Sequence, residues 1–194
     1  MKKIPFQIGI VASAAVIARC ASQPDHFYTL NVLPESVRTA MPTLHVRLAV
    51  SLPPLVDRPE MVLSAPPNGI LILDHERWAV ALSDQVSATL ARDLEARRGD
   101  VFVADRRFDQ APSPTVTIKV DIARMSVRRG GNASIKALWR VVDPRTGGDQ
   151  LGSAVFEAPL NGDGYGAVAE AYSQALSALA ERLARDLGGT AAPR

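Results

Sequence analysis

Cysteine, histidine and aromatic residues are scarce in this chain of 194 residues. The single cysteine, Cys20, excludes an intramolecular disulfide and a metal site built from cysteine pairs. The three histidines share no ligand spacing with one another or with Cys20, so we interpret each as a surface or strand residue: His26, His45 and His75. Aromatic residues make up 5% of the chain, which argues against an aromatic cage for a ligand. We therefore expect no metal and no cofactor.

The motifs that mark common enzymes are also missing. The chain has no Gly-x-Ser-x-Gly elbow, no phosphate-binding loop and no dinucleotide fingerprint. Adjacent His75 and Glu76 can be imagined as an acid–base group, and a periplasmic hydrolase that uses them is one alternative. A charged cluster just before a helix more often forms caps or ion pairs, however. The sequence therefore predicts a protein without catalytic residues.

No apolar run is long enough for a permanent membrane span. The run from Ile4 to Ala18 covers about 15 residues, whereas a spanning helix needs roughly 20. Lys2 and Lys3 precede this run, and Cys20 follows it. A basic start and a short apolar core are typical of an export signal, because the positive end stays at the inner face of the membrane. We therefore predict export from the cytoplasm.

The end of this signal has two readings. The four residues Ile17-Ala18-Arg19-Cys20 resemble a bacterial lipoprotein signal, in which the cysteine becomes the first mature residue and carries lipid. Arg19 departs from that pattern, since a small residue is expected before the cysteine. The alternative is an ordinary secretory cleavage after Ala18. Our prediction is a lipoprotein signal over residues 1–19, lipidation of Cys20 and a short tether over residues 20–26.

The formal charge of +2 does not describe the mature protein. Loss of Lys2, Lys3 and Arg19 leaves 19 basic residues against 20 acidic ones. Nucleic-acid binding requires a basic surface that neutralises phosphates, so no nucleic-acid partner is expected. The remaining residues suffice for one domain with its own core, which we place at residues 27–190.

The periodicity of apolar residues predicts the fold. Alternating patterns or short apolar runs predict strands at residues 27–30, 44–50, 61–64, 70–73, 101–104, 116–127, 134–142 and 151–157. A helix is expected to begin with Ser83 as its N-cap and to end at Gly99. A second helix of about 20 residues carries one apolar stripe from Val168 to Leu187. The predicted fold is α+β, an α/β sandwich with a single mixed, mainly antiparallel sheet and two helices packed on one face.

Three stretches resemble a known family. They are Cys20-Ala21-Ser22-Gln23-Pro24 with Phe27-Tyr28-Thr29-Leu30, then Leu52-Pro53-Pro54-Leu55-Val56-Asp57-Arg58-Pro59-Glu60-Met61-Val62, and finally Asn68-Gly69-Ile70-Leu71 with His75-Glu76-Arg77-Trp78-Ala79-Val80-Ala81-Leu82. Their order and spacing are similar to those of ABC-transport auxiliary lipoproteins of the PqiC/YmbA type. The resemblance is specific over residues 20–94 and rests on the pattern of elements beyond about residue 100. It implies that residues 27–190 form a single ABC-transport auxiliary domain.

The resemblance also implies a function and partners. Members of this family are accessory lipoproteins on the periplasmic side of the envelope, held at the outer membrane by a lipid that Cys20 would carry. Their partners are an MCE-domain protein and an ABC permease and ATPase, which together move lipid between membranes. The family member docks the tunnel of the MCE protein, and a homo-oligomeric ring is expected. A different reading is a carrier that binds a lipid or small molecule between the sheet and the helices.

Three residues in the family-like stretches are candidates for an interface or a structural role. Asp57 and Arg58 precede a proline, which fixes the backbone beside two opposite charges and favours a rigid corner. Trp78 offers a large amphipathic ring whose indole N–H requires a partner. A turn and a core position under the helix are the structural readings of these residues, and both stay open alongside an interface role.

Overall fold

The computed structural model describes residues 23–31, 41–104, 115–128 and 130–189. The export signal and Cys20 lie outside this part of the chain. The described elements follow one another as β1 (His26–Tyr28), β2 (Leu44–Ser51), β3 (Glu60–Ala65), β4 (Gly69–Trp78), α1 (Leu82–Arg97), β5 (Val101–Ala104), β6 (Val116–Val127), β7 (Asn132–Asp143), β8 (Gly148–Pro159) and α2 (Tyr165–Gly189). The α+β class and both predicted helices are confirmed.

A five-stranded sheet forms the main layer, with the strand order β5-β2-β6-β7-β8. β2 pairs in parallel with β5 and β6, whereas β6, β7 and β8 form antiparallel hairpins. A register shift between Ile122 and Arg124 interrupts β6. This irregularity keeps Met125 and Val127 on the buried face, although simple alternation from Ile122 would have placed Arg124 there.

The remaining strands form a second sheet, which corrects the prediction of a single one. Its order is β1-β4-β3, with β1 parallel to β4 and β3 antiparallel to β4. Three of the six strand pairings in the described chain are parallel, but the longest ladders are antiparallel, so the arrangement is mixed and mainly antiparallel as predicted. Alternation predicts which residues of a strand are buried, but it contains no information about which strand becomes the neighbour.

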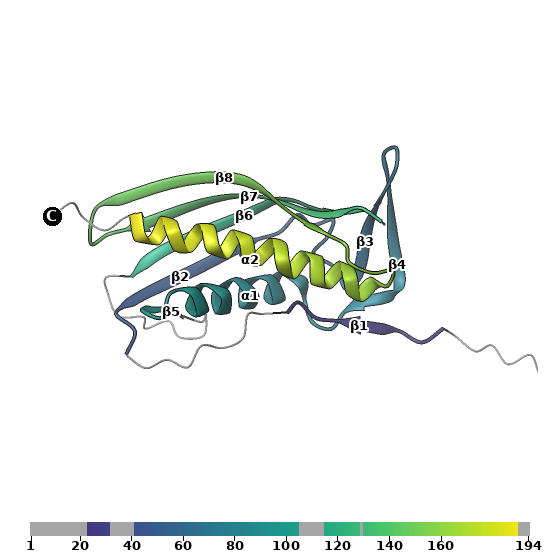
Figure 1. The fold of residues 1–194 in the computed structure, drawn as a ribbon, viewed down its shortest axis with the longest axis horizontal. Coiled ribbons are helices and arrows are strands. Elements are labelled where there is room, and N and C mark those ends of the chain that lie inside the picture. The colour runs from purple at the N-terminus through teal and green to yellow at the C-terminus, as the bar shows by residue number, and fades with distance from the viewer. Residues whose placement is uncertain (1–22, 32–40, 105–114, 129, 190–194) are drawn as a thin grey trace, which may run out of the picture.

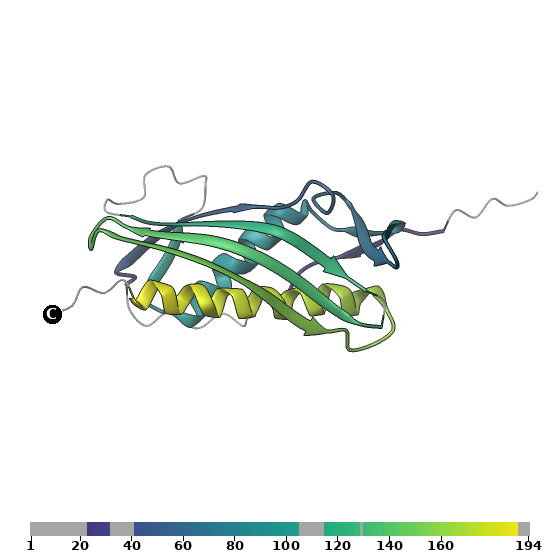
Figure 2. The same cartoon turned by 90° about the horizontal axis from the view of Figure 1, so that it is seen from above.

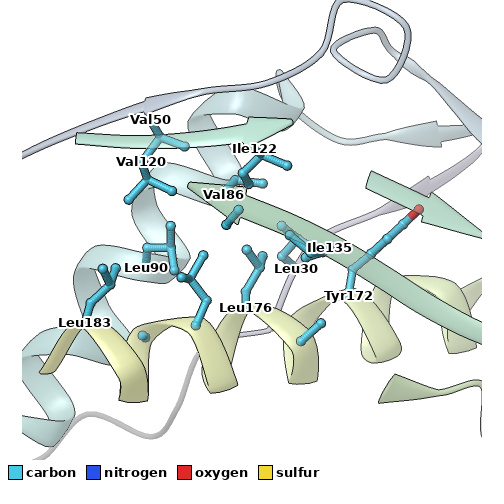
Figure 3. Packing of buried hydrophobic residues seen from close by; sticks show 14 of the residues in the cluster. Leu30, Val50, Val86, Leu90, Val120, Ile122, Ile135, Tyr172, Leu176 and Leu183 are labelled. Atoms are coloured by element: carbon cyan, nitrogen blue, oxygen red, sulfur yellow. The ribbon is translucent and has the colours of Figure 1, made fainter. Parts of the chain in front are cut away.

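Both helices pack against one face of the five-stranded sheet and against each other (Figures 1 and 2). Leu176, Leu179 and Leu183 of α2 are fully buried, as are Val86 and Leu90 of α1. Figure 3 shows side chains of both helices meeting those of the sheet in one continuous apolar layer. The space between sheet and helices is therefore occupied by side chains, and the opposite face of the sheet points away from both helices.

The predicted start of α1 is wrong in one detail. Ala81 is the N-cap residue, and its side chain makes no capping hydrogen bond. Ser83 lies inside the first turn, and its backbone N–H donates to the carboxylate of Asp57 at 3.2 Å. The partner for the helix start therefore comes from a loop 26 residues upstream in the sequence. The end of the helix agrees with prediction, with Arg97 in the last turn and Arg98 as C-cap.

Candidate functional site

The most distinctive surface of the described domain is the uncovered face of the five-stranded sheet, which we call the open face. Successive residues of a strand point to opposite sides, so the neighbours of the buried Trp139 point outward on β7. On this face three large apolar side chains are exposed: Leu138, Leu151 and Val155. Leu151 is 77% exposed, the highest value among the large hydrophobic side chains of the described strands. These residues form an apolar patch in the middle of two neighbouring strands.

A shallow hollow of about 720 Å³ lies on the open face. Its lining comes from four adjacent strands: Ala49, Val50 and Ser51 of β2, Lys119, Val120 and Asp121 of β6, Leu138, Trp139 and Arg140 of β7, and Leu151, Gly152 and Ser153 of β8. Leu138 stands opposite Ser153 in the strand register, and Leu151 stands opposite Arg140. The hollow thus combines an apolar floor with polar side chains at its margin, a composition suited to binding or docking.

Ion pairs and hydrogen bonds order the margin of the hollow. Arg140 donates through Nε to Asp149 Oδ1 at 2.7 Å, and this hydrogen bond holds the pKa of Asp149 below its usual value. The same pair raises the pKa of Arg140. Ser51 Oγ donates to Asp121 at 2.8 Å across β2 and β6. These polar groups are exposed, so they contribute little to stability but define the charge around the apolar patch.

The strands under the hollow are fixed to α2 by a buried indole. Trp139 Nε1–H donates to Asp186 Oδ2 at 2.8 Å, and Arg182 pairs with the other oxygen of Asp186 at 3.1 Å. Gly152 stands directly opposite Trp139 in the register, and a Cβ at this position would overlap the indole ring. Only glycine fits there. The indole therefore fills the inner side of β8 while Leu151 and Ser153 face outward.

Asp57 and Arg58 lie in the loop between β2 and β3, and each has its own partner. Asp57 accepts the hydrogen bond from Ser83, whereas Arg58 donates through Nε to Glu60 at 2.8 Å. The hydrogen bond from Arg58 lowers the pKa of Glu60. Both predicted residues thus make contacts within the domain, and they lie on a loop distinct from the open face.

Trp78 is buried beneath the helices. It ends β4, is 5% exposed, and its ring lies 6.5 Å from that of Tyr172 on α2. Burial raises the pKa of the Tyr172 hydroxyl. This position joins the small sheet to the helical layer.

His75 and Glu76 do not come together as an acid–base pair. As neighbours on β4 they point to opposite sides, and each has its own partner. His75 Nδ1 lies 2.9 Å from Asp25, while Glu76 accepts from Tyr28 at 2.6 Å and lies 3.1 Å from His26 Nδ1. These contacts join β4 to β1 and to Asp25, the residue just before β1.

The Glu76 cluster also changes two pKa values. Burial pushes the pKa of Glu76 upward, but the hydrogen bonds with Tyr28 and His26 outweigh it and lower the value. Burial and the neighbouring Glu76 raise the pKa of Tyr28 to about 12. The cluster therefore favours a charged carboxylate beside a neutral phenol.

Three further features of the described residues bear on function. Within the described ranges, no three His, Cys, Asp or Glu side chains lie close enough together to hold a metal ion. A second, polar hollow of about 390 Å³ lies between α1 and α2 and is lined by residues such as Asn31, Arg97 and Glu170. Neither α1 nor α2 has the combination of length and apolarity that a membrane-crossing helix needs.

The open face is a feature that the sequence analysis missed. Leu151 and Val155 lie on the outer side of β8, while Gly152, Ala154 and Phe156 lie on its inner side. Both sides of this strand contain apolar residues, so alternation does not distinguish the buried side from the exposed one. The one feature of the sequence that could have indicated an exposed apolar surface here is the absence of charge between Asp149 and Glu157.

Solved structures show the class of fold. One uncharacterised protein is similar with a TM-score of 0.72 and 18% identity, over 85% of this chain and 99% of its own. A protein from Xanthomonas campestris is similar with a TM-score of 0.61 and 17% identity, over 86% of this chain and 94% of its own. No curated protein sequence matches the chain. The described domain thus has an α+β fold that also occurs in other solved proteins.

The family follows from the sequence match. The profile described as "ABC-type transport auxiliary lipoprotein component" matches residues 28–184. The chain therefore belongs to the family of ABC-type transport auxiliary lipoprotein components, as the resemblance predicted. The family is one of auxiliary transport components, which implies a transporter partner and a place in the cell envelope.

Proposed function

We propose that this protein is a periplasmic, membrane-anchored accessory lipoprotein of an MCE/ABC-type intermembrane lipid transport system. In this proposal it has no catalytic role, and it docks the tunnel of the MCE-domain protein at the outer membrane. Cys20 carries the lipid, and residues 20–26 are the tether to a single domain over residues 27–190. The permease and ATPase supply the energy.

The open face is the observation that carries the docking role. It presents Leu138, Leu151 and Val155 on a rigid sheet, next to a hollow of about 720 Å³. Large apolar side chains gathered on one surface commonly mark a protein-binding site. Because the indole of Trp139 and the helices support these strands from behind, the patch keeps its shape without a partner. A preformed surface loses little conformational entropy on binding.

The carrier alternative requires a cavity between the sheet and the helices. That layer contains fully buried side chains such as Ile118, Ile135 and Leu179. Both hollows described above lie elsewhere, one on the open face and one between the helices. These observations favour docking over an interior ligand.

A homo-oligomer is part of the proposal, since several copies are needed to surround a tunnel. β8 is an edge strand of 12 residues with no lysine or arginine, and edge strands of this kind readily pair with another chain. By contrast, β5, the other edge, has 4 residues and the carboxylate of Glu95 accepts from its Val103 N–H at 2.8 Å. This contrast supports β8 as the side that faces a neighbour.

The test is affinity purification of the full chain from membranes in mild detergent, followed by mass spectrometry. The proposal expects an MCE-domain protein, together with the permease and ATPase, to be recovered. A purification that recovers none of them counts against the docking role, and a lipid recovered in equimolar amount with a lone chain favours the carrier.

A further inference from the structure

We propose that the β3–β4 hairpin rests on the surface of the lipid bilayer into which the anchor is inserted. The hairpin comprises residues 60–78 and turns at Pro66-Pro67-Asn68. This inference rests on the proposed lipidation of Cys20 and adds a second contact between the protein and the membrane. The two contacts together would fix the orientation of the domain.

The composition of the hairpin is the first argument. All thirteen residues from Met61 to Leu73 are uncharged, in a chain in which 22% of residues are charged. At the tip Ile70 is 49% exposed and Leu71 is 46% exposed. The buried side chains Met61 and Leu63 hold the base of the hairpin against the body. An exposed apolar tip without charges can enter the headgroup region without the cost of dehydrating an ion.

The position of the hairpin is the second argument. Figures 1 and 2 both place it at the end of the molecule at which the described chain begins, opposite the C-terminal end of α2. β1 is parallel to β4, with His26 beside Glu76. Phe27, the next residue of β1, is also exposed at this end. The described chain therefore begins on the side of the domain that carries the hairpin.

The length of the tether is the third argument. Cys20 precedes His26 by six residues, so it lies at most about 20 Å from it. The tip at Gly69 precedes Glu76, the partner of His26, by seven residues, which is about 23 Å of strand. The greatest distance of Cys20 from the His26–Glu76 pair is thus nearly equal to the distance of the hairpin tip from that pair. A flat bilayer that holds the anchor is within reach of the tip.

A bilayer suits this surface better than a protein partner does. The open face has an apolar patch bordered by Lys119, Asp121 and Arg140, as protein interfaces do. The hairpin itself has no charged residue between Glu60 and Asp74, and the one basic neighbour that bridges to it, Arg128 beside Ser64, is compatible with anionic lipid headgroups. The absence of charge from residues 61–73, which form the turn and the adjoining parts of both strands, matches a lipid surface, where charges at the contact would be unfavourable.

The test uses the full-length lipoprotein in vesicles of phosphatidylethanolamine and phosphatidylglycerol. Lipid occupies the thiol of Cys20, so a cysteine introduced by Leu71→Cys is the only free thiol and can carry an environment-sensitive fluorophore. We expect the emission of this probe to shift to the blue and to be quenched severalfold by a quencher attached to lipid chains. Asn68→Cys, at the turn, provides a second position in case Leu71→Cys alters the hairpin.

Leu151→Cys is the matched control, because Leu151 is an exposed leucine on the open face. Its probe should respond to a water-soluble quencher and not to the lipid-borne one. If the Leu71 and Asn68 probes behave like the Leu151 probe while the protein floats with the vesicles, the hairpin inference is wrong and the anchor stands. A blue shift without lipid-borne quenching means that protein covers the tip, which also overturns it. If the protein does not float with the vesicles, both the proposed lipid anchor and the hairpin inference are wrong.

Discussion

Asp57 Oδ1 accepts a hydrogen bond from the backbone N–H of Ser83, with 3.2 Å between oxygen and nitrogen. The first N–H groups of a helix have no partner within the helix, and a carboxylate near them also interacts favourably with the helix dipole. Asp57 therefore caps the start of α1, because the N-cap residue Ala81 has no side-chain hydrogen-bond acceptor. This contact gives one of the family-like residues a structural role.

Asp57→Ala should lower the free energy of unfolding by about 1 kcal/mol, the usual cost of a lost helix cap. Asp57→Asn should recover much of this loss, because the amide oxygen can still accept. Arg58→Ala removes a partly exposed ion pair with Glu60 and should cost less than Asp57→Ala, because solvent screens such pairs. Urea denaturation of the three variants measures these differences. Unchanged stability in Asp57→Ala, with loss of a binding partner, would instead favour an interface role.

Gly152→Ala should destabilise the protein although it adds only one methyl group. The new Cβ would overlap the indole of Trp139, and overpacking of this kind costs about 1–3 kcal/mol. Ser153→Ala is the control, since the side chain of this neighbour points to the open face. Thermal unfolding compares the two. Equal midpoints would show that Trp139 has room to move away from β8.

Trp78→Ala should be the most damaging of the substitutions considered. Truncation of a buried tryptophan costs about 3–5 kcal/mol, and this one packs against Tyr172. The measurement is the midpoint of denaturant unfolding, followed by near-ultraviolet circular dichroism for tertiary packing. A stable Trp78→Ala variant that loses partner binding would contradict the structural role.

The Tyr28–Glu76 hydrogen bond predicts a pH dependence of stability. The pKa of Tyr28 is raised from 10.0 to about 12, so the folded state favours the neutral phenol. The stability that it contributes is complete below pH 10 and is lost as the pH rises toward about 12. The pKa of Glu76 is lowered, so its contribution is present above the ordinary carboxyl range and is lost as the pH falls through its folded value.

A comparison of wild type with Tyr28→Phe separates the contribution of Tyr28 to the pH dependence of stability from that of the other tyrosines. Tyr172, whose pKa is also raised, is present in both proteins. The difference in free energy of unfolding between the two proteins should shrink between pH 10 and pH 12. Urea denaturation at several pH values provides the measurement. A difference that stays constant over this range would mean that Tyr28 does not titrate as a partner of Glu76.

Local patterns were sufficient for the order of the elements, but not for all of their lengths or for which strands pair. The strand predicted at residues 70–73 is β4, which runs from Gly69 to Trp78. Val46, Leu48 and Val50 alternate in the sequence and are buried in β2, and the stripe from Val168 to Leu187 is buried on α2. Alternation and helical periodicity report burial directly. The division into two sheets depends on which strands pair over long distances, and no local pattern contains that information.

The candidate site was less predictable than the fold. Asp57 and Trp78 stood out because the family-like motifs contain them, and both make internal contacts. Leu138 and Leu151 are ordinary strand residues in sequence, and they become a surface only because both helices cover the other face. A patch that depends on the arrangement of layers requires the structure.

The central claim is that the open face docks the transport partner, and Leu151→Asp tests it most directly. Val80→Asp is the matched control, because Val80 is 58% exposed but lies outside the open face. Tagged wild type and both variants are purified from membranes in mild detergent, and the recovered MCE-domain protein is measured against the tagged chain. We predict a severalfold loss for Leu151→Asp and no loss for Val80→Asp, with equal thermal midpoints. Equal recovery with all three proteins would contradict the claim.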